Sequence, residues 1–187
     1  MATDIKIQDK TSPMMQQWSA CKQEAKQAVL FFRLGDFYEA FYEDATTLAN
    51  ELGVTLTQRQ GIPMAGVPFH ASETYIDKLI AKGYNVAIAE QVEDPKATKG
   101  IVKREVVRRI TPGTVINSSL LSEKSNNFIG CLTRYNQTLG LSVLDITTAE
   151  FVVFEFESFS ILVDELSRLK VKELIVSEKM MSTHKKE

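Results

Sequence analysis

One short segment of the chain places aromatic and acidic side chains next to each other. Gly35-Asp36-Phe37-Tyr38-Glu39 contains two acids and two aromatic rings, and more aromatic residues flank it. Phe37 and Phe41 stand four residues apart, which is typical of the buried face of a helix. Phe37 would then lie in the first helical turn, where a side chain can project past the helix end into a partner, with Glu39 close by. The segment is therefore a candidate for direct contact with a ligand.

Gly61 and Gly66 have the spacing of the glycines in a phosphate-binding loop. The lysine and hydroxyl residue that must follow are replaced by Val67 and Pro68. Pro63 and Pro68 also lack the backbone N–H groups that such a loop directs at phosphate. The segment therefore does not predict a nucleotide site.

Catalytic and metal-binding patterns are missing from the sequence. The two histidines, His70 and His184, and the two cysteines, Cys21 and Cys131, do not have the spacing of metal ligands. His70 stands in a segment rich in Pro and Gly, where a structural hydrogen bond is more typical than a catalytic base. Since no local arrangement predicts an activated nucleophile, we expect neither catalysis nor a metal site.

An alternative of a different class is a small α/β phosphohydrolase that uses Asp36 or Asp145. This alternative predicts metal-dependent turnover. The sequence carries no cluster of acids that would hold the metal, and adjacent acids such as Glu43-Asp44 are usually solvated. The argument against a phosphohydrolase is therefore only mild.

Composition is that of an ordinary globular protein: 187 residues, 44% hydrophobic, 25% charged and a formal net charge of −2. Between Lys96 and Arg109, six bases meet one acid, which would attract phosphate but is also typical of a solvated face. No stretch approaches the ~20 apolar residues of a membrane span, and the polar start has no apolar core of a signal peptide. With only two cysteines, we expect a protein of the reducing cytoplasm, with no membrane partner.

Periodicity predicts a mixed α/β unit up to about residue 116. Ser12-Pro13 starts a helix, and Asp36 would cap a second helix that ends at Gly53. Ser72 would cap a third helix that Gly83 ends. The predicted strands are 29–34, 54–57, 85–90 and 101–110, and 58–69 is predicted to be a loop.

The pattern changes after a polar segment, 116–127, which is typical of an interdomain linker. Three strand-like runs follow in close succession and indicate a β-meander, and helical spacing then precedes another short strand. The end of the chain, 180–187, is predicted to be frayed. The predicted elements of this second unit are strands 128–135, 139–146 and 149–156, a helix over 159–170 and a strand over 174–176.

A series of ordered sequence blocks runs through the first 115 residues: Thr11-Ser-Pro-Met-Met-Gln-Gln17, Phe32-Arg-Leu-Gly-Asp-Phe-Tyr-Glu39, Leu56-Thr57 to Arg59, Ile62-Pro-Met-Ala-Gly-Val-Pro-Phe-His-Ala71, Ala89-Glu-Gln91 with Asp94-Pro95, Lys99-Gly100 and Arg109-Ile-Thr-Pro-Gly-Thr114. In these blocks the chain resembles the MutS family of DNA mismatch-recognition proteins. Leu144-Asp145 and Thr147-Thr148 continue the resemblance more weakly.

The resemblance implies a fold and a pair of site residues. It implies a mixed-sheet α/β mismatch-recognition domain over 1–116, a linker over 117–127 and an incomplete RNase H-like connector domain over 128–187. Phe37 and Glu39 match the family's Phe-x-Glu pair, in which Phe stacks on a mispaired or unpaired base from the minor groove and Glu hydrogen-bonds to it. The implied function is recognition of such bases at the start of DNA mismatch repair.

Further DNA contacts are implied at matching positions. Arg59, Met64 and His70 would lie near the backbone and minor groove, and Arg108 in the basic run would contact phosphate. The segment between Arg59 and Ile62 is shorter than in many members of the family, which makes the contacts of this loop less secure than those of Phe37 and Glu39.

The family's lever, clamp and C-terminal ATPase do not match any part of the chain, which therefore resembles an N-terminal fragment without catalytic activity or cofactor of its own. For the full-length protein the resemblance implies ATP and Mg²⁺, a homodimer, mismatched duplex DNA and the repair protein MutL as partners, and a place at the nucleoid in a bacterial cytoplasm. An alternative is a protein-interaction module that does not read DNA, which near-neutral charge and exposed aromatic residues would suit.

Overall fold

A computed structural model describes residues 12–93, 100–115 and 126–183, which fall into two compact units, Met1–Ile110 and Thr111–Glu187. The predicted linker lies almost wholly outside the described residues. Within the described residues, no helix is both long and apolar enough to cross a membrane.

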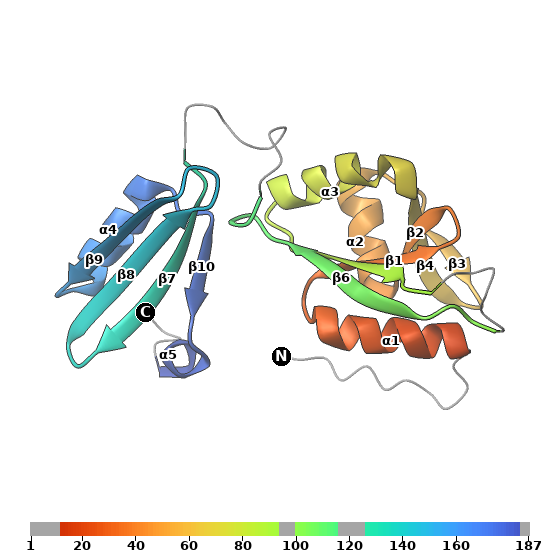
Figure 1. The fold of residues 1–187 in the computed structure, drawn as a ribbon, viewed down its shortest axis with the longest axis horizontal. Coiled ribbons are helices and arrows are strands. Elements are labelled where there is room, and N and C mark those ends of the chain that lie inside the picture. The colour runs from red at the N-terminus through yellow and green to blue at the C-terminus, as the bar shows by residue number, and fades with distance from the viewer. Residues whose placement is uncertain (1–11, 94–99, 116–125, 184–187) are drawn as a thin grey trace. The chain divides into compact units, whose positions relative to one another are not determined.

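The first unit is a mixed six-stranded sheet in the order β3-β4-β2-β1-β5-β6. β1 and β5 run parallel, and every other neighbouring pair is antiparallel. Figure 1 shows α1 on one side of this sheet and α3 on the other. The elements are α1 Pro13–Ala25, β1 Val29–Leu34, β2 Phe37–Phe41, α2 Tyr42–Leu52, β3 Thr57–Arg59, β4 Ile62–Pro68, the 3₁₀ turn η1 Phe69–Ala71, α3 Ser72–Ala81, β5 Val86–Gln91 and β6 Arg104–Ile110.

Helix α1 confirms the prediction from Ser12-Pro13. The Ser12 hydroxyl accepts a hydrogen bond from the Met15 N–H at 3.4 Å, and Pro13 occupies the first turn. Trp18 is buried and meets the edge of the Phe41 ring at a centroid distance of 5.8 Å. The apolar stripe of α1 thus covers one face of the sheet.

The predicted helix from Asp36 is wrong in its first part. Phe37 begins strand β2, which pairs with β1 through a tight turn at Gly35, whose φ is +58°. Residues four apart share a face in a strand as well as in a helix, so the spacing of Phe37 and Phe41 fits both. The helix itself starts at Tyr42 and ends at Gly53, as the glycine predicts.

The predicted loop over 58–69 is also wrong, because it contains a β-hairpin. Gln60 and Gly61 turn with φ of 53° and 80°, and strands β3 and β4 pair on either side. Pro63 lies opposite β3 alone and Pro68 opposite β2 alone. Each proline therefore has one unpaired edge, where a missing N–H removes no ladder bond.

The third helix and the last two strands of the unit agree with their predictions. Ile76, Leu79 and Ile80 are buried on one side of α3, and Gly83 follows with φ of 87°. Ala71, and not Ser72, is the N-cap residue; the Ser72 hydroxyl is buried and donates to the Phe69 carbonyl.

The second unit is a four-stranded sheet in the order β10-β7-β8-β9, with the β10–β7 pair parallel. Helix α4 packs its Leu162 into a core with Leu141 and Val143. The predicted meander, helix and strand are present, but part of the end that was expected to be frayed forms a helix. The elements are β7 Phe128–Tyr135, β8 Thr138–Asp145, β9 Glu150–Phe156, α4 Phe159–Leu169, β10 Glu173–Val176 and α5 Glu178–Thr183.

Candidate nucleic-acid interface

Strand β2 presents Phe37 and Glu39 on one face of the first sheet, because residues two apart in a strand point the same way. The Phe37 side chain is 47% exposed, although Phe41 of the same strand is buried. Between the two, Tyr38 points to the other face and is buried. The exposed ring and the carboxylate are therefore neighbours by strand geometry alone.

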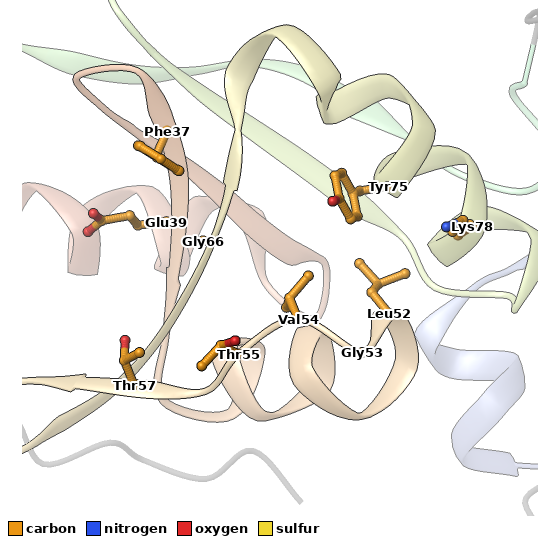
Figure 2. A pocket seen from close by; sticks show the side chains of 10 residues that line it. All are labelled: Phe37, Glu39, Leu52, Gly53, Val54, Thr55, Thr57, Gly66, Tyr75 and Lys78. Atoms are coloured by element: carbon orange, nitrogen blue, oxygen red, sulfur yellow. The ribbon is translucent and has the colours of Figure 1, made fainter.

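Strand β4 has no side chain next to this pair at Gly66, which lies directly opposite Glu39. A Cβ added at Gly66 would lie 3.5 Å from the Glu39 Cγ and 3.9 Å from the Phe37 Cδ1. Figure 2 shows Phe37 and Glu39 together on one side of β4. The φ of Gly66 is not in the left-handed region, so the glycine matters here for space and not for backbone conformation.

Strand β3 brings Arg59 to the same face. Its register with β4 sets Arg59 opposite Ile62, and Ile62 shares a face with Gly66. Arg59 Nη1 donates to Glu39 Oε2 at 3.4 Å. We call the residues of this side the β2–β4–β3 face: Phe37, Glu39, Arg59, Ile62, Met64 and Gly66.

The electrostatic state of Glu39 reflects two opposing influences. Burial raises the pKa of Glu39, and the Arg59 guanidinium lowers it, with the net change upward. The Glu39 side chain is 16% exposed, whereas that of Arg59 is 49% exposed and reaches solvent. Glu39 is thus a carboxylate that takes up a proton more readily than an exposed one.

An open cavity of about 530 Å³ adjoins Phe37 and Glu39. In Figure 2, Leu52, Val54 and Tyr75 lie on the opposite side of β4 from the Phe37 and Glu39 side chains. The wall is mixed, with apolar, hydroxyl and basic groups. The lining residues are Phe37, Glu39, Leu52, Gly53, Val54, Thr55, Thr57, Gly66, Tyr75 and Lys78.

Met64 and His70 have different surroundings. Met64 shares the β2–β4–β3 face but is partly buried and packs against the core beneath α1. His70 is exposed in η1, two residues beyond Pro68, which pairs with Phe37. Its ring meets that of Phe69 at a centroid distance of 6.0 Å. The structure therefore places His70, which is exposed, near the Phe37 end of β2, and the partly buried Met64 opposite Phe41, at the other end of that strand.

A cluster that the sequence did not reveal supports the β1–β2 turn from the other face. The Arg33 guanidinium lies 3.7 Å above the Phe69 ring centroid and 3.8 Å from Glu90. Tyr38 donates its hydroxyl hydrogen to Glu90, and burial together with this bond raises the pKa of Tyr38 to about 12. Arg33 and Tyr38 are cross-strand partners, a pairing visible only once the Gly35 hairpin is known.

Arg108 lies apart from this site. It stands on β6, at the opposite edge of the sheet from β3, and pairs with Glu73 of α3 at 2.8 Å. The other described bases of the run are also engaged: Lys103 with Glu105, Arg109 with Glu24, and Arg104 with the backbone carbonyls of Arg33 and Val102. Lys96 and Lys99 lie outside the described residues. In its described part, the bases of the run are held by ion pairs and hydrogen bonds within the protein.

Asp145 is occupied by the fold of the second unit. It is 1% exposed and accepts hydrogen bonds from the Asn127 N–H and from the N–H and hydroxyl of Thr147. Burial raises the pKa of Asp145, but these bonds outweigh it and the net change is downward. Asp36 belongs to the first unit. Among the described residues, no group of three or more His, Cys, Asp or Glu side chains is placed to hold a metal ion, and nothing described favours the phosphohydrolase alternative.

Comparison with known proteins gives a family match for each of two regions of the chain. Residues 12–119 match the family model described as MutS domain I, and residues 127–187 match MutS domain II. Relatives named DNA mismatch repair protein MutS include those of Protochlamydia amoebophila (62% identity over 95% of this chain), Chlamydia abortus (47% over 94%) and Desulforamulus reducens (51% over 89%). The chain covers 21%, 22% and 20% of these relatives, respectively, or about a fifth of their length. Because the two domain models together match most of its residues, the chain belongs to the MutS family.

Proposed function

We propose that the first unit recognises mispaired or unpaired bases in duplex DNA from the minor groove. Phe37 would stack on the displaced base, and Glu39 would hydrogen-bond to it. One observation carries the proposal: a half-exposed Phe37 and a largely buried Glu39 stand two residues apart on the β2–β4–β3 face.

The energetics of a wedge explain how Phe37 would discriminate. An apolar side chain that enters a base step must unstack it and kink the duplex, which costs a few kcal/mol. The cost is smallest where base pairing is already broken. The protein would therefore detect how easily the duplex kinks at a site, independently of its sequence. The space beside Gly66 would let the ring and the base approach without a neighbouring side chain in the way.

Glu39 would add discrimination through its charge. A carboxylate beside DNA is repelled by the phosphates, and it recovers that loss only where a displaced base offers a hydrogen bond. Burial raises the pKa of Glu39 and so favours the neutral acid, and the Arg59 guanidinium opposes this. Arg59 and His70, both accessible beside this pair, would contact the backbone, and Met64 would line the groove side.

We further propose that the chain acts within a longer repair protein that is an ATPase with Mg²⁺, forms a homodimer, and works with MutL in a bacterial cytoplasm. The relatives, of which the chain covers about a fifth, carry the name DNA mismatch repair protein MutS. The Gly61–Gly66 segment does not fit a nucleotide, because Gly61 lies in a hairpin turn and Gly66 lies within strand β4, so the segment is no phosphate loop.

The second unit suits a protein partner, which keeps the interaction-module alternative open for that part. Phe151 and Val153 on β9 are 62% and 60% exposed, while Val152 and Phe154 between and beside them pack toward α4. Such an apolar edge is a feature of protein-binding surfaces.

Titration of the chain against a duplex with one mispair and against its fully paired control, over a range of salt, tests the proposal. We expect tighter binding to the mispaired duplex and a steep loss of affinity for both as salt rises, because phosphate contacts release counterions. Equal affinity for the two duplexes would overturn mismatch reading, and binding insensitive to salt would favour the interaction module.

A further inference from the structure

The ion pair of Glu39 and Arg59 spans the width of strand β4. Arg59 on β3 stands opposite Ile62, and Glu39 on β2 stands opposite Gly66, so the Arg59 side chain reaches diagonally across β4. The contact joins Nη1 to Oε2 at 3.4 Å. Arg59 comes from a three-residue edge strand, and among the described residues its side chain is hydrogen-bonded to Glu39.

Arg59 is also the charged group, among the described residues, that acts on the ionisation of Glu39. Lys78 lines the same cavity, and the Arg104 guanidinium lies 5.3 Å from the ring centroid of Phe32, the β1 partner of Glu39. The pKa of Glu39 is raised by burial and lowered by the Arg59 guanidinium, which is hydrogen-bonded to it. The charge state of Glu39 therefore depends on two opposing influences: burial, which favours the neutral acid, and Arg59, which favours the anion.

The geometry points to Arg59 as a specificity-determining residue that holds Glu39 as an anion. This inference rests on the proposed function and assigns a part of it to a second side chain. As an anion, Glu39 repels the phosphates of a paired duplex and accepts hydrogen bonds only. The bases that suit it are therefore those whose broken pair exposes a ring N–H or amino donor.

The Arg59 guanidinium can hold the Glu39 carboxylate and still contact the DNA backbone. Arg59 has five N–H donors in a planar fork, of which the structure uses one for Glu39. The Arg59 side chain is half exposed, so its other N–H groups are open to a hydrogen bond with a DNA phosphate. Lysine keeps the charge but lacks the fork, which makes Arg59→Lys a graded variant.

The test measures the mispair preference of the chain as a function of pH at constant ionic strength. The probes are a duplex with a single G·T pair and its fully paired control. Wild type should lose preference as the pH falls through the pKa of Glu39. Arg59→Gln should lose it at a pH higher by about half to one unit, since a nearby opposite charge lowers a carboxyl pKa by about one unit or more and partial exposure weakens that.

Three controls isolate the effect. Lys82→Gln removes a similarly exposed cation that is paired with Glu51, and it should leave the profile unchanged. Arg59→Lys should shift the profile less than Arg59→Gln. In a Glu39→Gln background, Arg59→Gln should weaken binding to both duplexes equally and shift no midpoint.

A measurement without DNA separates this inference from the proposed function. The titration midpoint of the Glu39 carboxyl carbon, followed by NMR in the free chain, should rise in Arg59→Gln. Unchanged midpoints in both experiments, with wild-type mispair preference intact, would overturn the role of Arg59 and leave mismatch reading standing. A wild type without any mispair preference would overturn the proposed function, and with it the specificity role, whatever the NMR midpoint shows.

Discussion

One face of the first sheet is covered by helix α1 along part of its width and bare along the rest. Phe41 and Phe37 lie on this same face of the same strand, yet Phe41 is 1% exposed and Phe37 is 47% exposed. Trp18 of α1 covers the Phe41 ring. No residue of α1 lines the cavity next to Phe37. The residue type and the strand face are the same, so coverage by α1 decides which ring stabilises the fold and which can contact a ligand.

The largest expected effect separates these two rings. Phe41→Ala should lower the free energy of unfolding by about 3–5 kcal/mol, because it empties a closed core. Phe37→Ala should lower it by less than about 1 kcal/mol. Trp18, the single tryptophan, sits in this core, and its fluorescence during urea denaturation reports the first unit. Equal losses for the two variants would show that Phe37 is a core residue.

A second test compares two carboxylates, the buried Asp145 and the Glu39 of the β2–β4–β3 face. Asp145→Ala should destabilise the second unit by about 2–3 kcal/mol, since it leaves the N–H groups of Asn127 and Thr147 unpaired. The pKa of Asp145 is depressed in the fold, so its contribution is complete above pH ~3.9 and disappears as the pH falls through the folded value. Thermal melts of wild type and Asp145→Ala, followed by circular dichroism from about pH 2 to about pH 7, measure this contribution. An Asp145→Ala variant as stable as wild type at neutral pH would contradict the stabilising role of Asp145.

A smaller effect is expected from filling the space at Gly66. In Gly66→Ala the new methyl would lie 3.4 Å from the Tyr38 carbonyl oxygen and 3.5 Å from the Glu39 Cγ, so stability should change by less than about 1 kcal/mol. The preference for a mispaired duplex should fall about fivefold, or ~1 kcal/mol, because the methyl occupies the approach to the pair. Competition binding measures this, and an unchanged preference would show that the space is not used.

The smallest expected effect is that of Glu39→Gln on stability. Because burial raises the pKa of Glu39, the folded state favours the protonated acid over the anion. The stability that the protonated acid contributes at low pH is lost as the pH rises through the folded pKa. The glutamine variant carries no such charge and should be as stable as wild type at pH 7, within about 0.5 kcal/mol. A clear destabilisation, measured by Trp18 fluorescence, would mean that the ion pair with Arg59 supports the fold.

Periodicity predicted most elements of the fold but not the geometry of the site. The helix from Pro13 and the meander from Phe128 were found because capping residues and alternating patterns are local signals. The spacing predicts a helix at Phe37 because an i, i+4 pattern does not distinguish helix from strand. The two prolines of β4 predict a loop, although each lies at a position with one unpaired edge and is compatible with a strand. The pairing of Arg59 with Glu39 depends on the register of three strands, which no local pattern contains.

The most direct test of mismatch reading is the mispair preference of Phe37→Ala, measured beside wild type with thermal melts of both. We predict that the variant melts like wild type and loses about 1–3 kcal/mol of binding to the mispaired duplex, as expected for a lost base–aromatic stack, while its affinity for the paired duplex changes little. A Phe37→Ala variant that is folded and keeps the full preference would contradict the account.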